Sequence, residues 1–391
     1  MKKTTMNNKK SLIAINISVF LIMLGVGMIV ALLPQRVMDL SDSVTVVGLL
    51  ASVFAITYVL AQIPIGHLAD KIGFKKLLIA GYLICAVVGL LYLGAKTSTH
   101  ILMGRFLQGI GEVPIWALAP ALLSLQYADT KGKVIGLYNA SLHLGLCIGP
   151  LLGMLLVRTA EQGDRAFIFF AAVSFAGGLI VYLFLEDFRS ETTAERFNLG
   201  KMVSLLSEHR VLVVLIGIAL YGAAYGLMLT IIPAFLITVK SFNQTMISLM
   251  FSLFYIAVSL SQLAAGSLSD RKGRRGVMMW GLFFAAAGLA LFSPLQSPPV
   301  YLLIALASFG LGMFSVSAMA YLNESVADSL KGTISGAFYL FWGLGFFLGP
   351  LLAGKIGETV GFGIGFYLLA FLLAAEILLL KINLPSEVIK D

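Results

Sequence analysis

The sequence predicts an all-α integral membrane protein in which twelve transmembrane helices form two pseudo-symmetric halves of six helices each. Three observations support this prediction: long apolar segments recur along the whole chain, charged residues are scarce, and short motifs return at a constant offset of 200 residues. Of the 391 residues, 59% are hydrophobic and 12% are charged. A soluble domain has roughly 25% charged residues, so we expect this chain to lie in a lipid bilayer.

Each apolar segment is long enough to cross a bilayer as a helix, which takes about 20 residues. Backbone groups need hydrogen-bond partners inside lipid, so unbroken apolar segments of this length must be helical. Several segments exceed the minimum, which predicts tilt or a short extension beyond the membrane. The expected spans are approximately 11–34, 45–66, 76–95, 99–127, 134–158, 165–185, 211–238, 245–267, 277–294, 299–323, 332–354 and 360–380.

The longest polar stretch, residues 186–210, lies in the middle of the chain. We expect a cytoplasmic linker at 189–210, with six-helix halves at 1–188 and 211–391. Paired halves in a membrane protein usually move about a central site, which indicates transport.

The distribution of lysine and arginine predicts the orientation of the chain. Basic residues concentrate in alternate loops and in the N-terminal segment, which holds Lys2, Lys3, Lys9 and Lys10. By the positive-inside rule both termini are expected in the cytoplasm, in a multi-pass protein of the cell (inner or plasma) membrane. The net charge of +8 then sets topology and does not indicate nucleic-acid binding. The first apolar segment is too long for the core of a signal peptide, so we expect it to stay as a span.

A loop motif of the form Gly-x-Leu-x-Asp-x-x-Gly joins the second and third expected spans as residues 66–73. It returns between the eighth and ninth spans as residues 266–273. Glycine tolerates the tight turn that such a short loop needs. The aspartates can cap a helix or pair with a cation, and the basic residues after them can anchor the next helix at the anionic inner leaflet. Topogenic charge alone explains the basic residues but not the repeated pattern.

This pattern, with twelve spans, two halves and a central linker, resembles the major facilitator superfamily of secondary transporters over essentially the whole chain. The first copy departs from the usual motif at His67 and Phe74. The resemblance implies the major facilitator fold and a charge network around the loop aspartates that closes a cytoplasmic gate. The gate residues expected from the two copies are Asp70, Lys75, Asp270, Arg274 and Arg275.

Two glutamates lie near the ends of spans. Glu324 ends the tenth span at the membrane level of the second loop motif, so we expect it to form a gate pair with a basic residue there. Glu376 lies five residues before Lys381 near the end of the twelfth span. Snorkelling of this side chain to the interface is the expected explanation.

The fourth span contains the pattern Arg105-x-x-Gln108-Gly-x-Gly, followed by Glu112. The pattern resembles the fourth-span motif of proton-coupled members of the superfamily, whose arginine is implicated in proton transfer. Spacings of three and four residues place the three side chains on one helix face. Arg105 and Glu112 are about 10 Å apart along the helix axis, so both can line one cavity without bonding each other.

Glu112 falls near the middle of its span, where a charge costs at least about 2.5–3.5 kcal/mol. The cost falls if the carboxyl faces water, pairs with a cation or is protonated. We therefore expect Glu112 to take the coupling proton, with Arg105 and Gln108 in its network; a structural ion pair would also explain it. The family motif usually has a small residue there, so this role is inferred from depth and charge. His143 can titrate near neutral pH, although a lone histidine more often only hydrogen-bonds a neighbour.

The fifth span has glycines at regular spacing followed by a proline, and the eleventh span repeats the pattern. The first copy resembles the antiporter motif of the drug–proton antiporter branch, with Met154 in place of one glycine. Small residues predict close helix packing and the prolines predict bends. A shared packing hinge would explain both copies, so the motif favours export without excluding import. The residues are Gly136, Gly145, Gly149, Pro150 and Gly153 in the fifth span and Gly345, Gly349 and Pro350 in the eleventh.

Polar and aromatic residues in the spans predict the substrate cavity. Many rings and few inward charges suit a small amphipathic or apolar molecule. The candidates are Asn16, Tyr58, Gln62, Trp116, Asn139, Tyr221, Tyr225, Tyr255 and Trp342.

Other classes of protein lack their sequence signatures. The chain has no phosphate-binding loop, and its four histidines and two cysteines lack metal-ligand spacing. We therefore expect no enzyme, no cofactor and no metal. The sequence predicts a monomeric secondary transporter that exports a drug-like molecule against protons by alternating access, as in multidrug resistance. The alternative is import of a small metabolite, by proton symport or by facilitated diffusion.

Overall fold

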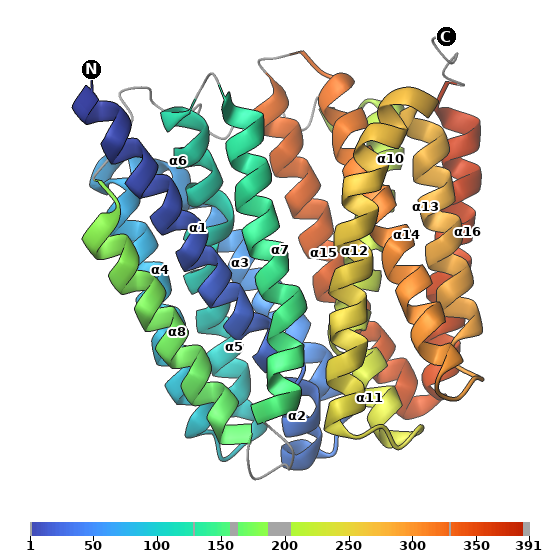
Figure 1. The fold of residues 1–391 in the computed structure, drawn as a ribbon. Coiled ribbons are helices and arrows are strands. Elements are labelled where there is room, and N and C mark those ends of the chain that lie inside the picture. Colours follow the sequence, from blue (N-terminus) through green and yellow to red (C-terminus); the bar gives the residue numbers. More distant parts are fainter. Residues whose placement is uncertain (1, 128–129, 157–162, 187–204, 328–329, 386–391) are drawn as a thin grey trace. The chain divides into compact units, whose positions relative to one another are not determined.

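The computed structural model describes residues 2–127, 130–156, 163–186, 205–327 and 330–385 (Figure 1). These residues are almost entirely helical and include no strand, which confirms the all-α prediction. By contacts the chain divides into two compact units. The first unit comprises Met1–Ser41, Val53–Arg196 and Phe242–Ser252, and the second comprises Asp42–Ser52, Phe197–Ser241 and Leu253–Asp391.

Each unit is a bundle of helices. The first unit contains α1 (Lys2–Val30), α2 (Leu33–Ser41), most of α3 (Val44–Ile72), α4 (Phe74–Leu93), α5 (Ser98–Val113), the π-helical turn η1 (Pro114–Leu118), α6 (Ala119–Gln126), α7 (Lys131–Leu156) and α8 (Gly163–Phe184). The second contains α10 (His209–Leu229), α11 (Ile231–Thr238), most of α12 (Gln244–Lys272), α13 (Arg274–Leu291), α14 (Pro299–Glu324), α15 (Lys331–Thr359) and α16 (Phe362–Asn383).

The helices pack in the same unit as their neighbours along the chain and beyond. In the first unit α1 packs on α7 and α8, and α4 packs on α5 and α8 (Figure 1). In the second unit α13 packs on α14 and α16, and α10 packs on α15.

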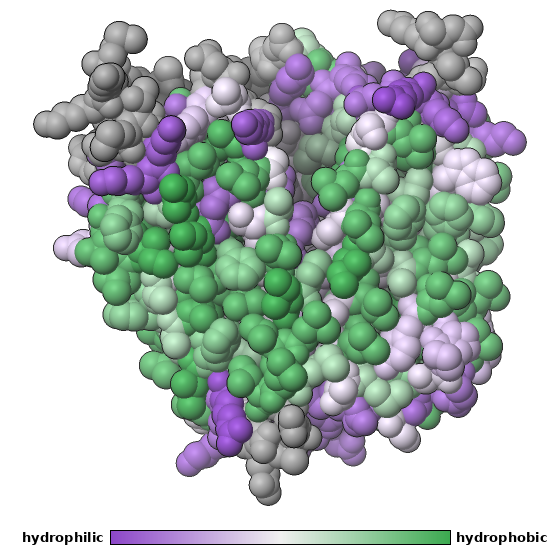
Figure 2. All heavy atoms as spheres, in the orientation of Figure 1, coloured by the Kyte–Doolittle hydropathy of each residue, from purple (hydrophilic) through white to green (hydrophobic). Residues whose placement is uncertain are grey.

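The described helices account for the predicted spans. Eleven helical segments are long and apolar enough to cross a membrane by length and composition. The twelfth, α13, has 18 residues and occupies the expected ninth span; its two leading arginines lower its mean hydropathy. Large apolar side chains are exposed along the helices, and polar residues gather at the helix ends (Figure 2). Such wide apolar surfaces suit lipid, and the chain is a multi-pass membrane protein.

Prolines end the first helix of each half early. Pro34 and Pro233 lie just inside α2 and α11. A proline has no backbone N–H, and its ring collides with the carbonyl group four residues earlier. Those earlier residues are Val30 and Leu229, the last residues of α1 and α10.

The fourth predicted span is also interrupted, and here the two halves differ. α5 ends at Val113, and Pro114 opens the π-helical turn η1. The carbonyl oxygen of Ile115 in this turn accepts a hydrogen bond from the Tyr138 hydroxyl of α7. The corresponding tenth span, α14, runs unbroken from Pro299 to Glu324. π-Helical turns occur frequently at functional sites, and this one directly follows Glu112.

The glycines of the repeated motif pack α7 against α1 and α15 against α10. A β-carbon at Gly145 would lie 2.6 Å from the carbonyl oxygen of Phe20, and one at Gly149 would collide with the carbonyl oxygen of Leu24. In the second unit, a β-carbon at Gly345 would collide with the carbonyl oxygen of Ala219. Backbones this close require a residue without a side chain.

Gly136 does not have the packing role that the motif predicts. A β-carbon there would meet no described atom within 4 Å. The reason is helix geometry: Gly136 lies nine residues, or about two and a half turns, before Gly145, and so on the opposite face of α7. The face of Gly145 packs on α1, where a β-carbon at Gly153 would lie 3.2 Å from Met28. Both α7 and α15 continue as helices through Pro150 and Pro350.

The two units do not separate simply at the linker predicted for residues 189–210, because each unit includes the start of one helix from the other half of the sequence. The beginning of α3 belongs to the second unit and the beginning of α12 to the first. The Glu358 carboxylate at the end of α15 accepts hydrogen bonds from the Ser43 hydroxyl at 2.6 Å and from the Thr45 backbone N–H at 2.9 Å. It thus caps the start of α3. In the first unit the Gln244 side chain of α12 donates to the carbonyl oxygen of Ala31 at 3.1 Å.

Replacement of Gly145 by valine should lower the thermal stability of the detergent-solubilised protein. The added side chain would force α7 away from α1, and overpacking of this kind costs about 1–3 kcal/mol. The matched control is Gly136→Val, which makes the same chemical change in α7 where no described neighbour is displaced. Equal melting temperatures for the two variants would contradict the packing account.

Candidate functional site

Three polar side chains form a buried chain along one face of α5. Arg105, Gln108 and Glu112 are 4%, 0% and 2% exposed. Arg105 Nη1 donates to Gln108 Oε1 at 3.1 Å, and Gln108 Nε2 donates to Glu112 Oε1 at 2.7 Å. The amide of Gln108 therefore connects two opposite charges that the helix geometry holds too far apart to pair directly.

The π-helical turn supplies the second hydrogen bond to Glu112. Trp116 Nε1 donates to Glu112 Oε2 at 3.0 Å, so each carboxylate oxygen accepts one hydrogen bond from a side chain. Trp116 itself is only half-buried. The buried carboxyl is thus in direct contact with an aromatic residue that the sequence predicts for the substrate cavity.

Tyr92 of α4 completes the environment of Gln108. Its hydroxyl donates to Gln108 Oε1 at 2.7 Å. Two donors on the amide oxygen and one acceptor for the amide N–H fix the direction in which Gln108 points. No local pattern in the sequence points to Tyr92. Gly104 of α5 makes room for it, because a β-carbon there would overlap the Tyr92 ring.

The guanidinium of Arg105 also faces an aromatic ring from α3. Its central carbon lies 4.7 Å from the centroid of the Phe54 ring, a cation–π contact. Phe54 stacks on Tyr58, with ring centroids 5.7 Å apart. Tyr58, predicted for the substrate cavity, therefore lies one ring away from Arg105.

Two other predicted residues of the first unit are held by local hydrogen bonds. Asn16 links α1 to α7, because its Oδ1 accepts from the Ser141 hydroxyl at 3.0 Å. His143 Nδ1 lies 2.9 Å from the carbonyl oxygen of Asn139 in its own helix. This contact agrees with the interpretation of His143 as a residue that bonds a neighbour. Asn139 is exposed and Gln62 half-buried.

The predicted cavity residues of the second unit form one aromatic cluster, which consists of Tyr221, Tyr225, Phe254, Tyr255, Trp342 and Phe346. Tyr225 is its centre, with ring centroids 5.9 Å from Tyr221, 5.1 Å from Phe254 and 6.4 Å from Trp342. Edge-on and tilted contacts of this kind stabilise aromatic pairs. Phe254 and Phe346 were not predicted, because phenylalanine is common throughout the spans.

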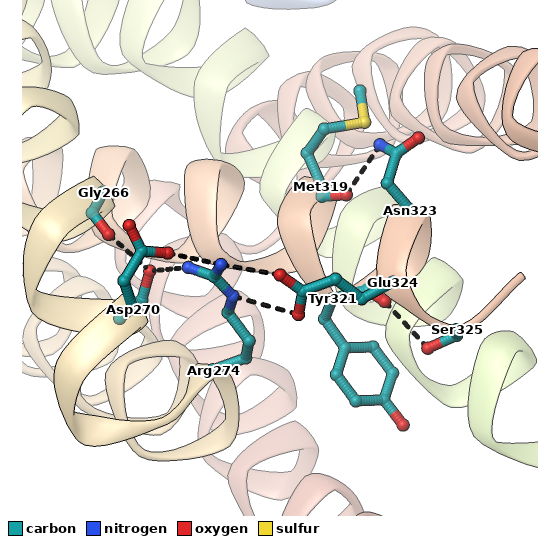
Figure 3. Close-up of polar contacts among 9 residues, drawn as sticks. Gly266, Asp270, Arg274, Met319, Tyr321, Asn323, Glu324 and Ser325 are labelled. Atoms are coloured by element: carbon teal, nitrogen blue, oxygen red, sulfur yellow. Dashed lines mark hydrogen bonds and ion pairs between the residues drawn. The ribbon is translucent and has the colours of Figure 1, made fainter. Parts of the chain in front are cut away.

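At the second loop motif, Arg274 joins α12, α13 and α14 (Figure 3). Its guanidinium forms two hydrogen bonds with the Glu324 carboxylate, at 2.7 and 3.2 Å, and an ion pair with Asp270. It also donates to the Ser269 hydroxyl at 2.6 Å. Hydrogen bonds to Glu324 raise the pKa of Arg274 above its ordinary value, so the arginine stays charged. The predicted partners Asp270, Arg274 and Glu324 are thus in contact.

The other predicted gate residues differ from this arrangement. Arg275 donates at 3.0 Å to the carbonyl oxygens of Lys381 and Leu384, so it caps the end of α16 instead of pairing with a carboxylate. Lys75 lies over the Tyr182 ring at 5.7 Å. The Asp70 side chain lies outside the part of the chain that is described.

The expectation that Glu376 snorkels to the interface is wrong. The residue is 1% exposed, because it lies on the face of α16 that packs against α10. The sequence of α16 is apolar on all sides, so periodicity could not identify this face.

Among the described residues, eleven helical segments suited to a membrane, the further apolar helix α13 and a loop motif that occurs twice in the sequence are features of a membrane transporter. The chain belongs to the Major Facilitator Superfamily, whose family model matches residues 15–246 and 214–390.

The relatives are distant but cover most of the chain. An uncharacterised MFS-type transporter of Methanocaldococcus jannaschii is 25% identical over 90% of this chain and 92% of its own length. The class H tetracycline resistance protein of Pasteurella multocida is 27% identical over 88% of each chain. A proton-coupled antiporter flippase of Staphylococcus saprophyticus is 25% identical over 90% of this chain and 88% of its own. A crystal structure of a nucleoside transporter has the same fold, with a TM-score of 0.80, 16% identity and coverage of 95% and 98%.

Replacement of Gln108 by leucine should destabilise the protein more than replacement of Tyr92 by phenylalanine. Leucine would leave buried hydrogen-bonding groups of Arg105 and Glu112 without this partner, at about 1–3 kcal/mol for each group. The Tyr92 variant loses one hydrogen bond, worth about 0.5–1.5 kcal/mol. Thermal unfolding in detergent measures both, and a smaller loss for Gln108→Leu would show that the chain of hydrogen bonds is not a structural unit.

Proposed function

We propose that this protein is a proton-coupled exporter that moves a small amphipathic or drug-like molecule out of the cell by alternating access. The observation that carries the proposal is the buried Glu112 carboxyl, hydrogen-bonded through Gln108 to Arg105 and directly to Trp116. The names of two relatives, a tetracycline resistance protein and a proton-coupled antiporter, support the direction and the coupling ion.

Glu112 takes and releases the coupling proton in this proposal. The ionised carboxylate accepts one hydrogen bond at each oxygen and is balanced by Arg105 through Gln108. Protonation turns one oxygen into a donor and makes it a weaker acceptor, so one of the two N–H groups is bonded less strongly. This favours movement of Gln108 or Trp116. A proton is thereby converted into a side-chain rearrangement beside the substrate cavity.

Aromatic side chains bind the substrate in this proposal. Trp116 and Tyr58 provide rings near the polar chain of the first unit, and the aromatic cluster provides rings in the second unit. Rings with few charges favour an amphipathic or cationic molecule over a strongly anionic one. Release of Trp116 when Glu112 is protonated would change the first of these groups of rings and so exclude simultaneous binding of substrate and proton.

The gate contacts change as access alternates. The Arg274–Glu324 pair holds α13 to α14 at the loop motif, which we place at the cytoplasmic side. The Glu358 carboxylate holds the start of α3, which we place at the opposite side. Both termini are cytoplasmic, the working unit is a monomer, and the membrane is the cell membrane in this proposal.

Glu112→Gln tests the proposal in proteoliposomes loaded with a fluorescent amphipathic substrate. Glutamine keeps the shape of the side chain but cannot ionise. We expect substrate exchange at equilibrium to continue and proton-driven accumulation to fall at least about tenfold, which corresponds to about 1.4 kcal/mol of lost coupling. The control is Glu208→Gln, which removes an exposed carboxyl of α10's N-terminal flank. Full proton-driven accumulation in Glu112→Gln would refute the role of Glu112, and substrate entry in the direction of the proton would favour symport.

A further inference from the structure

Glu376 is a buried carboxyl that the proposed mechanism does not use. It lies on α16, well inside the span, and is 1% exposed. Neither carboxylate oxygen has a hydrogen-bond partner among the described residues. By contrast, each oxygen of the equally buried Glu112 accepts a hydrogen bond. The environment of Glu376 therefore provides no compensation for a negative charge.

The neighbours of Glu376 are a glycine and an aromatic ring. A β-carbon at Gly217 of α10 would lie 3.0 Å from Glu376 Oε1 and 2.7 Å from Phe314 Cζ of α14. The absence of a side chain at Gly217 thus makes the space that the carboxyl occupies. Phe314 also contacts Tyr221, with ring centroids 6.5 Å apart, and so connects this site to the aromatic cluster.

The charged and titratable groups on the helices around Glu376 are directed elsewhere or lie toward the helix ends. Arg274 and Arg275 of α13 bond Glu324 and the last carbonyls of α16. On α10, Tyr221 is one turn beyond Gly217 and interacts with Ser315. The remaining titratable residues of α14, α15 and α16 are Tyr301, Tyr321, Glu324, Lys331, Tyr339, Lys355, Glu358, Tyr367 and Lys381. None of the described groups compensates a charge on Glu376.

We propose that Glu376 is a second proton-binding site of the transporter, occupied by a proton in this arrangement of α10, α14 and α16. An ionised carboxylate without a partner is strongly disfavoured in an apolar interior, whereas the neutral acid is tolerated. When α10 and α14 move apart, water reaches the carboxyl. The O–H bond then breaks, the electron pair stays on the carboxylate and the proton passes to water. This inference rests on the proposed function for its proton gradient.

Packing gives this second site a physical connection to substrate binding. The Phe314 ring lies beside Gly217, the glycine next to the Glu376 carboxyl. The same ring also contacts the ring of Tyr221. Tyr221 in turn contacts Tyr225 at the centre of the aromatic cluster. A substrate that displaces Tyr225 would therefore disturb the packing that keeps Glu376 dry. Contact alone does not establish coupling, so the test measures it.

Infrared spectroscopy of the full-length protein in lipid detects the protonated carboxyl directly. In Glu112→Gln, which removes the first candidate carboxyl, a buried protonated-carboxyl band should remain at neutral pH and weaken when the pH is raised. The band should be absent from the Glu112→Gln/Glu376→Gln double variant and unchanged when the exposed Asp164 is replaced by asparagine instead. If the Glu112→Gln protein shows no such band, Glu376 is not protonated and the proposal is overturned. This result does not require a variant of Glu376 to fold.

The number of protons moved per substrate tests the role in transport. Measured from the membrane potential at which net flux reverses, this number should fall by one in Glu376→Gln, with substrate binding retained. An unchanged proton number would overturn the proposal. If the wild-type protein moves no protons while the infrared band is present, the proposed function fails but the protonated carboxyl stands.

Discussion

The hydrogen bonds of Gln108 are the interaction on which the account of this transporter depends. A guanidinium and a carboxylate lie on one helix face inside a membrane-spanning unit, and each is almost completely buried. Alone, either charge would be costly at this depth. Gln108 bonds both, while Tyr92 fixes its orientation from α4. Gly104 allows this approach, because any side chain there would occupy the space of the Tyr92 ring.

The two halves share their packing but not their chemistry. Glycines bring α7 onto α1 and α15 onto α10 in the same way, and a proline interrupts α1–α2 and α10–α11 at matching places. Among the described helices, the fourth span alone combines buried charges with a π-helical turn, whereas α14 is continuous and bears its carboxylate, Glu324, at its end. The repeated features suit helices that move as matched pairs. The unmatched ones suit a coupling site located in the first unit, with a second buried carboxyl on α16.

Much of this arrangement could be predicted from the sequence because the membrane limits the choices. Apolar length predicts the helices, and the loop glycines predict the turns, where Gly73 and Gly273 have φ angles of 93° and 88°. Helical spacing predicts that Arg105, Gln108 and Glu112 share a face. The hydrogen-bond partners could not be predicted in the same way. Trp116 reaches Glu112 from a π-helical turn, and Tyr92 comes from another helix.

Residues at helix surfaces were harder to assign. Arg275 caps α16 because the last carbonyl groups of that helix lie beside it in the fold. No pattern in the sequence near Arg275 indicates this contact. The burial of Glu376 cannot be predicted from periodicity because α16 is apolar on every side, and contact with α10 decides which face is packed. Gly136 fits the motif but has no described neighbour for the motif to serve. For Arg275 and Glu376 the deciding fact is tertiary contact rather than spacing along the chain.

The central claim is that substrate and protons move in opposite directions through this protein. It is tested most directly by proton flux in proteoliposomes of the wild-type protein, recorded with a pH-sensitive dye while an outward or inward substrate gradient is applied. Antiport predicts proton movement opposite to each substrate gradient, across a panel of amphipathic compounds and not with strongly anionic ones. Proton movement in the same direction as the substrate, or substrate movement with no proton flux, would contradict it.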